Sequence, residues 1–373
     1  MKALVFERSL PKYGAAMVAG RLRPGSGARV GPLRLADVDE PELPGPGWHR
    51  VRPRLAGICG SDLATIDGKS SRYFEPIVSF PFVPGHEVVG ELDDGTRVVI
   101  EPVLKCATRG TECAQCREGR TNLCERIAFG HLSPGLQTGY CADTGGGWGT
   151  TLVAHDSQLH RVPDDLSDEA AVMVEPTACA VHAARFVTTD DVAVIGAGTL
   201  GLCTVAALTG RRVVVAAKHP EQRQFARQLG ARVVAPNELD RAVRTATSSF
   251  VAGSQLTAGV PTVVDCVGSE ASLAQALQIV APGGTIVLVG MPGRLTVDLT
   301  SLWHREVALV GAYAYTAEDF ATAFDVVRSA RLDRLVSALY PLDRFREAVD
   351  HAAAAGSRGA VKIAFDLRKE KRR

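Results

Sequence analysis

The sequence predicts an α/β protein with two domains, one rich in β-strands and one built on a doubly wound parallel sheet. With 373 residues, the chain is too long for one ordinary hydrophobic core. Residues 1–175 contain short strand patterns and many turns, whereas from about residue 190 apolar strands alternate with helical stretches. That alternation is typical of a parallel sheet with helices on both faces.

The elements of each half follow from their hydrophobic periodicity. In the first half, RVVIEPVL (97–104) predicts a strand, TGGGWGT (144–150) predicts a loop, and helical patterns are scarce. The C-terminal segment predicts a helix over 340–356 and a strand over 360–367. Between them the sequence predicts a strand, glycine turn and helix (191–210), a strand (211–217), a helix (221–231), a strand (261–268), a helix (271–281) and two strands (283–290 and 307–314).

The composition indicates a globular protein with no nucleic acid or membrane partner. Apolar residues make up 46% and charged residues 22% of the chain, and the formal net charge is +1. The first residues, MKALVFERSLPKYG, lack the apolar core of a signal peptide. No run approaches the ~18 apolar residues that span a bilayer. We therefore expect a cytoplasmic protein whose thiols stay reduced.

Four of the nine cysteines gather in one short segment, as Cys106, Cys113, Cys116 and Cys124. Clustered cysteines in a cytoplasmic protein point to a metal before a disulfide. Four thiolates close a tetrahedral zinc site and leave no position for substrate, so we expect a structural zinc in a lobe at about 105–125. Two other interpretations stay open: unrelated buried thiols, or a redox pair of Cys113 and Cys116.

The turn Gly196-Ala197-Gly198-Thr199-Leu200-Gly201 follows an apolar strand and opens a helix. In that context a G-x-G-x-x-G string is typical of a dinucleotide site. The glycines allow a tight turn and a close approach of the pyrophosphate to the N-terminus of the helix, where free N–H groups favour anions. A merely tight turn is the alternative interpretation.

The end of the next strand favours NADP over NAD. An acidic residue about 20 positions after the glycine turn would bind the 2′-hydroxyl of NAD. The sequence instead has Val215-Ala216-Ala217-Lys218-His219, with no carboxylate. Lys218 and Arg223 are expected to meet a 2′-phosphate, so NADP is preferred and NAD remains possible. Lys218 as a solvated loop lysine is the alternative interpretation.

Three further segments carry single cysteine, histidine and glutamate residues: GICGSDL (57–63), PGHEVVG (84–90) and VEPTACAVHAA (174–184). Their order, together with the cysteine lobe and the motifs GAGTLG and GGTIVLVG, resembles the zinc-dependent medium-chain alcohol dehydrogenases along nearly the whole chain. The Glu-Pro at 175–176 resembles the polyol, sugar and threonine dehydrogenase branch. The resemblance implies a GroES-like catalytic domain from residues 1–180 and 319–373, with a Rossmann domain inserted at 181–318.

The resemblance also implies a catalytic zinc site. Cys59, His86 and Glu175 resemble the ligands, and Glu87 resembles an acidic ligand or close neighbour. Three protein ligands with one open position describe a catalytic zinc.

Five other positions complete the implied site. Asp62 resembles the carboxylate that orients the zinc-bound histidine, and Ser61 resembles the hydroxyl that takes the substrate proton. Val267, Val289 and Gly290 are expected to contact the cofactor.

Departures from the family pattern affect both zinc sites. Gly110 stands where the first cysteine of the lobe is usual, and Cys106 replaces it if the loop folds back. Ala64 stands in place of a relay histidine, so the proton must leave by water or by a group such as Thr65 or His49.

The first functional hypothesis is a zinc-dependent NADP dehydrogenase acting on a secondary alcohol, such as a polyol, sugar or amino alcohol. The alternatives are a reductase of an activated C=C or C=N bond and a non-enzymatic sensor of NADP(H). The resemblance implies a homodimer or homotetramer, with edge strands around 285–313 extending a sheet across subunits. The Gly- and Pro-rich segment 10–47 is expected to reshape the rim of the cleft.

Overall fold

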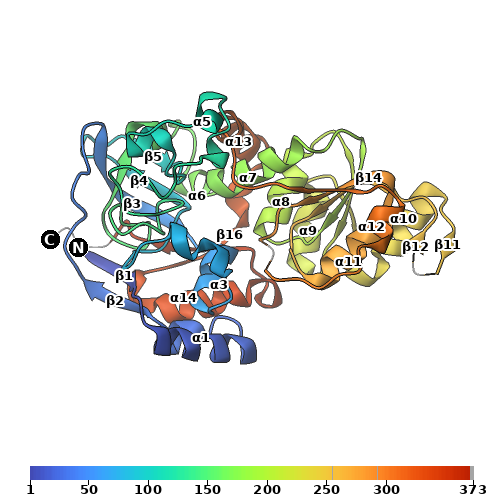
Figure 1. Ribbon diagram of the computed structural model, residues 1–373, viewed down its shortest axis with the longest axis horizontal. Coiled ribbons are helices and arrows are strands. Elements are labelled where there is room, and N and C mark those ends of the chain that lie inside the picture. Colours follow the sequence, from blue (N-terminus) through green and yellow to red (C-terminus); the bar gives the residue numbers. More distant parts are fainter. Residues whose placement is uncertain (254, 292, 370–373) are drawn as a thin grey trace. The chain divides into compact units, whose positions relative to one another are not determined.

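The computed structural model describes residues 1–253, 255–291 and 293–369. It divides the chain into two compact units. The first consists of Met1–Glu175 and the described residues from Arg331 on, and the second of Pro176–Ala330. In Figure 1 the first unit runs from blue to green and returns in red-brown, and the second runs from yellow-green to orange. The second unit is therefore inserted between two parts of the first in the sequence.

The secondary structure has the following bounds. The strands are β1 (Lys2–Phe6), β2 (Leu33–Asp37), β3 (Trp48–Gly57), β4 (Val88–Glu91), β5 (Arg97–Ile100), β6 (Leu152–His155), β7 (Leu159–Arg161), β8 (Asp191–Ile195), β9 (Arg212–Ala216), β10 (Arg232–Val234), β11 (Val251–Ala252), β12 (Gln255–Leu256), β13 (Val260–Asp265), β14 (Val280–Leu288), β15 (Ala308–Gly311), β16 (Val336–Tyr340) and β17 (Lys362–Asp366). The helices are α1 (Leu10–Leu22), α2 (Gly27–Val30), α3 (Gly60–Ile66), α4 (Cys106–Arg109), α5 (Ala114–Arg117), α6 (Asp168–Ala171), α7 (Val174–Ala184), α8 (Thr199–Ala207), α9 (Pro220–Gln228), α10 (Leu239–Thr247), α11 (Glu270–Ile279), α12 (Thr300–His304), α13 (Ala317–Ala330) and α14 (Phe345–Ala353). Across the described residues, no helix is both long and apolar enough to cross a bilayer.

The sheet of the first unit is organised by the long strand β3. The strand order is β16-β17-β3-β4-β5-β7, and β6 pairs with the first half of β3. The second half of β3 pairs with β4 and β17. Strand β3 therefore pairs with three strands, and its two halves have different partners. The register shifts between Pro53 and Leu55, because proline has no N–H for the ladder. This arrangement brings the carboxyl end of β3 beside β17.

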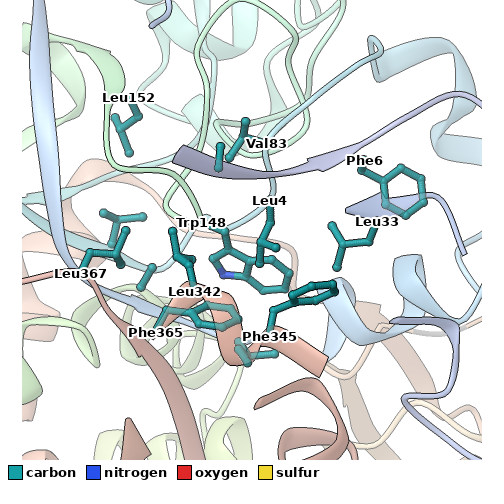
Figure 2. Close-up of a cluster of buried hydrophobic side chains, with 14 of the residues drawn as sticks. Leu4, Phe6, Leu33, Val83, Trp148, Leu152, Leu342, Phe345, Phe365 and Leu367 are labelled. Carbon is teal, nitrogen blue, oxygen red and sulfur yellow. The ribbon is translucent and has the colours of Figure 1, made fainter. Parts of the chain in front are cut away.

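The core of the first unit forms around Trp148, whose side chain is completely buried. Figure 2 shows its indole among Leu4, Leu342 and Phe365, which come from both ends of the chain. The Trp148 and Phe365 rings lie 5.1 Å apart in an edge-to-face arrangement, and the indole Nε1 donates to the carbonyl of Gly57 at 3.1 Å. The predicted glycine-rich loop is therefore a loop that also supplies the largest fully buried side chain among the described residues.

The second unit contains the predicted doubly wound sheet. Its strands are all parallel and follow the order β10-β9-β8-β13-β14-β15. The first strand in sequence, β8, lies between β9 and β13, and this reversal is the point at which such sheets bind dinucleotides. The carboxyl ends are in register, since Ile195 pairs with both Ala216 and Asp265. The fold class predicted from the sequence is confirmed.

Helix α1 was not foreseen, because helical patterns are scarce in the first half of the sequence. It begins after Ser9 with Pro11 in its first turn, a position that proline favours. Only Ala16 and Gly20 are buried, whereas Leu10 and Leu22 are 81% and 85% exposed. The helix therefore lacks the apolar face on which helix prediction depends.

Candidate active site

The candidate site begins where β3 ends and the chain turns into α3. Cys59 occupies the N-cap position, and its backbone N–H donates to the Asp62 carboxylate oxygen Oδ2 at 2.9 Å. This bond satisfies an N–H group that the helix cannot pair internally. The first turn of α3 thus carries the Cys59 thiol, the Ser61 hydroxyl and the buried Asp62 carboxylate.

His86 lies in the turn before β4, and the glycine before it is required there. Gly85 has a φ of +97°, and a Cβ at that position would lie 2.4 Å from Trp148 Cδ1. The imidazole is buried, with Nδ1 at 3.4 Å from Asp62 Oδ1 and Nε2 at 3.5 Å from Ser61 Oγ. The structure therefore brings the three predicted residues His86, Asp62 and Ser61 together.

The charge around His86 is negative. Burial alone lowers the pKa of His86, but the Asp62 carboxylate and the Cys59 thiol outweigh burial and raise the pKa well above its ordinary value. A surrounding that favours the imidazolium also favours a bound cation. The electrostatics of this position therefore suit a metal ion.

Glu87 forms a buried ion pair with Lys362 of β17. Both residues are 1% exposed, and Lys362 Nζ also donates to the Ile58 carbonyl at 3.3 Å. A Cβ on Gly57 would lie 2.0 Å from Glu87 Oε2, so glycine leaves the space that the pair fills. Glu87, which was predicted as an acidic ligand or a close neighbour of the zinc, is thus paired with Lys362. The sequence analysis did not identify this lysine.

Glu175 lies in the first turn of α7 and is buried. The pKa of Lys362 indicates that Glu175 lies near Glu87 and Cys59. Burial lowers the pKa of Lys362, but the negative groups of Glu87, Cys59 and Glu175 outweigh burial and raise it. Predicted metal-binding residues from three segments thus all raise the pKa of one buried ammonium group, and Glu87 contacts it directly.

The chemistry of Cys59, His86 and Glu175 fits a zinc ion, because zinc binds thiolate, imidazole and carboxylate groups. His86 Nδ1 is buried and makes no hydrogen bond to a described residue. Within the described ranges, the four-cysteine cluster alone brings three or more ligand atoms within 4.8 Å of one another. The ligand atoms of Cys59, His86 and Glu175 are therefore spaced more widely than those of that cluster.

The cysteine lobe fits a closed zinc site. The thiols of Cys106, Cys113, Cys116 and Cys124 all lie within 4.8 Å of one another, and Cys106 Sγ lies 3.6 Å from Cys124 Sγ. Tetrahedral zinc with bonds of ~2.3 Å separates its sulfur atoms by about 3.8 Å. Cys106 thus takes the place that Gly110 leaves vacant.

The cluster also favours the thiolate form at one cysteine. Burial raises the pKa of Cys113, but backbone N–H groups of Cys116 and Glu125 outweigh burial and lower it to about 7. A thiolate is the form that binds zinc. The backbone therefore favours the thiolate at Cys113, whereas burial raises the pKa of Cys116 and raises that of Cys124 to about 11.

The structure adds two residues that the sequence analysis missed. Arg109, 1% exposed, donates to the carbonyl of Leu104 just before the lobe and to those of Phe129, Leu132, Ser133 and Gly135 in the following loop. Nothing in the local sequence distinguishes Arg109 from a surface arginine. Lys362 had a signal, since a single lysine inside the apolar strand AVKIAFDL implies a buried partner.

The glycine turn of the second unit fits a dinucleotide. Gly196 has a φ of +92°, and a Cβ on Gly201 would lie 2.0 Å from the Gly196 carbonyl oxygen. A Cβ on Gly198 would meet no atom within 4 Å, so that face of the turn is open to a ligand. Thr199 and Leu200 form the first turn of α8, and the N-terminus of a helix favours anions.

The other predicted cofactor residues follow β13 and β14 at the same edge of the sheet. Asp265, completely buried, accepts from the backbone N–H of Val267 at 2.8 Å through its side chain. Its carbonyl accepts from Val289 at 2.9 Å and from Gly290 at 3.0 Å. Asp265 therefore holds both segments at the carboxyl end of the parallel sheet, where dinucleotides bind.

Lys218 and Arg223 lie beyond the end of β9. Ala217 is completely buried and Lys218 is exposed. Arg223 Nε donates to the Ala217 carbonyl at 2.9 Å, which holds the guanidinium beside the loop. Two cationic side chains thus flank the position where NAD enzymes of this fold carry an acidic residue.

Comparisons with known proteins cover both units. Residues 45–164 match the alcohol dehydrogenase GroES-like domain, and residues 198–329 match the zinc-binding dehydrogenase family. The chain is 30% identical to sorbitol dehydrogenase of Arabidopsis thaliana, over 87% of this chain and 90% of the relative. It is 29% identical to L-idonate 5-dehydrogenase of Vitis vinifera, over 90% and 92% of the two chains. The crystal structure of 2R,3R-butanediol dehydrogenase from Bacillus subtilis superposes with a TM-score of 0.70 at 25% identity, covering 90% and 96%.

Proposed function

The chain belongs to the zinc-dependent medium-chain alcohol dehydrogenase family, in its polyol dehydrogenase branch, and from this premise we propose that it oxidises a secondary alcohol of a polyol, sugar or amino alcohol with NADP. It is an oxidoreductase of the alcohol dehydrogenase type. The proposal rests on the surroundings of His86. Its Nδ1 lies 3.4 Å from Asp62 Oδ1, and its Nε2 lies 3.5 Å from Ser61 Oγ. The sorbitol, idonate and butanediol activities named for the relatives support a hydroxylated substrate.

Cys59, His86 and Glu175 would hold the catalytic zinc. When bound, zinc lowers the pKa of a substrate hydroxyl, and the nicotinamide accepts the hydride. Asp62 Oδ1 lies 3.4 Å from His86 Nδ1 and would orient the imidazole for the metal. Glu87 is held by Lys362 and stays a neighbour of the site in this arrangement.

Ser61 would take the proton of the substrate hydroxyl, and Thr65 supports its position. Thr65 Oγ1 donates to the Ser61 carbonyl at 3.0 Å and lies 2.9 Å from Ser70 Oγ. His49 is paired instead with Asp156 at 2.7 Å, with both side chains well exposed. These contacts favour the Thr65 side over His49 as the exit for the proton.

The preference for NADP rests on charge. Lys218 and Arg223 would contact a 2′-phosphate, and the segment 215–219 offers no carboxylate to a 2′-hydroxyl. The glycine turn supplies the pyrophosphate site for either cofactor.

A homodimer or homotetramer is proposed for the assembly and the cytoplasm for the location. Strand β15 lies at the edge of the sheet, and Leu309, Tyr313 and Trp303 nearby are 40%, 44% and 78% exposed. The cysteines are free thiols, which is the usual state in the cytoplasm. Sedimentation would decide the assembly.

The test of the function is reduced-nicotinamide absorbance with NADP and NAD against polyols, sugars, amino alcohols and simple secondary alcohols. Each assay is repeated after zinc removal and after zinc restoration. Turnover with one alcohol class that disappears and returns with zinc is the expected result. No turnover by fully zinc-loaded protein that binds NADP tightly would contradict the proposal.

A further inference from the structure

Asp62 Oδ1 is shared between His86 and a tyrosine that the proposed reaction does not use. Tyr140, 8% exposed, places its hydroxyl 3.4 Å from this oxygen, which also lies 3.4 Å from His86 Nδ1. The Tyr140 ring lies 6.0 Å from the His86 ring and 5.3 Å from that of Phe82. The other carboxylate oxygen, Oδ2, is fixed by the backbone N–H of Cys59. Tyr140 is therefore a side chain whose hydroxyl approaches the oxygen that faces the histidine.

Two further hydroxyls contact the Tyr140 hydroxyl directly or through one another. Tyr140 Oη lies 3.2 Å from Thr65 Oγ1, which lies 2.9 Å from Ser70 Oγ. Each hydroxyl has one proton to donate, and an ionised Asp62 attracts the nearest one. Thr65 donates its one proton to the Ser61 carbonyl at 3.0 Å, so the Tyr140 hydroxyl is the donor toward Asp62 Oδ1.

The phenol is suited to a donor role. Burial and then the charge of Asp62 raise the pKa of Tyr140, so it keeps its proton at neutral pH. His86 Nδ1 is buried without a hydrogen bond to a described residue. The carboxylate is the group that can satisfy this N–H once Nε2 binds a metal.

We propose, resting on the proposed function, that Tyr140 is a positioning residue that holds Asp62 Oδ1 against His86 Nδ1 and thereby strengthens zinc binding at His86. A carboxylate fixed at both oxygens keeps the imidazole in one orientation and tautomer. Groups that orient a metal-bound histidine typically change metal affinity by ~10–100-fold. Tyr140 acts one bond further out, so an effect of about tenfold is expected.

The experiment follows zinc release from full-length, zinc-loaded protein into excess chromogenic chelator, with activity measured in parallel. Tyr140→Phe keeps the ring and removes the hydroxyl. We expect the zinc whose loss parallels the loss of activity to leave about tenfold faster, while the four-cysteine zinc leaves at the wild-type rate. Tyr340→Phe is the matched control, since it removes a phenol 2.9 Å from His351 Nδ1 elsewhere in the same unit.

Three further variants test whether the effect passes through Asp62. In Asp62→Asn the Tyr140→Phe change should add little, because the two residues act in one network. Thr65→Val should speed release in the same direction, and Thr65→Ser should restore the wild-type rate. Wild-type release rates in both Tyr140→Phe and Thr65→Val would overturn the inference. If zinc loss leaves wild-type activity unchanged, the proposed function itself fails.

Discussion

The carboxylate of Glu87 and the ammonium of Lys362 form an ion pair in which both side chains are buried, although 275 residues separate them. Lys362→Met should lower the free energy of unfolding by ~3–5 kcal/mol, because it leaves a buried carboxylate unpaired. Adding Glu87→Gln should recover part of this loss. Urea unfolding measures both effects.

The control for this prediction is Arg212→Gln, which breaks the exposed pair with Asp191 and should change stability little. An equal loss in Lys362→Met and in the double variant would show that the buried charge is not the cause.

Cys106→Ser should remove the structural zinc. The expected zinc content falls by one per chain and the melting temperature falls, because the lobe loses a ligand from its closed site. Cys141→Ala removes a buried thiol outside the cluster and should keep the full metal content. Elemental analysis of the dialysed variants measures the content, and an unchanged value in Cys106→Ser would reduce the site to three cysteines.

The sequence predicted those parts of the fold whose signals are local. The glycine turn at Gly196–Gly201 is recognised from a motif of six consecutive residues. The strand before it and the helix after it are predicted from hydrophobic periodicity. The cysteine lobe is also local, although only the structure brings Cys106 to the other thiols. Helix α1 was missed because its apolar side chains point to solvent.

The residues of the candidate active site lie far apart in the sequence, and the spacing between them does not predict that they form one site. Cys59, His86 and Glu175 come from three separate segments, and only resemblance to a family grouped them. Lys362 and Tyr140 were missed as partners of Glu87 and Asp62, because the fold alone brings these pairs together.

Lys218→Ala should weaken NADP binding and leave NAD binding unchanged. Loss of one exposed contact to a doubly charged phosphate is expected to raise the dissociation constant by about tenfold. Titration calorimetry or fluorescence with each cofactor measures the change. Lys369→Ala, a lysine of the first unit, is the control. Equal wild-type affinities for NADP and NAD would contradict the assigned preference.

Cys59→Ser and His86→Ala should each abolish turnover while the fold is retained. Each change removes a proposed ligand of the catalytic zinc, so zinc content should fall while the cysteine lobe stays loaded. Far-ultraviolet circular dichroism tests the fold. His155→Ala, which removes a histidine with Ser157 as a neighbour at 3.0 Å, controls for loss of an imidazole. Full turnover in either ligand variant would contradict the site.

Asp319 should make the second unit sensitive to acid. It is completely buried at the start of α13, where His182 Nδ1 of α7 lies 2.8 Å from its carboxylate and Thr316 donates twice. Burial raises the pKa of Asp319, but His182 and Thr316 outweigh burial and lower it from 3.8 to about 2. A carboxyl group with a lowered pKa stabilises the fold above its unfolded pKa and loses that effect as the pH falls toward its folded pKa.

The displacement of the Asp319 pKa corresponds to about 2 kcal/mol of stability at neutral pH. Asp319→Asn should therefore be less stable than wild type by about this amount between pH 5 and 7, with the gap reduced to about half near pH 3. Urea unfolding across this range measures the gap. Asp325→Asn, an exposed carboxylate on the same helix, should show no such trend. If the difference in stability between wild type and Asp319→Asn is the same at pH 6 and pH 3, Asp319 stabilises the fold by packing. Only a contribution from its charge would depend on pH.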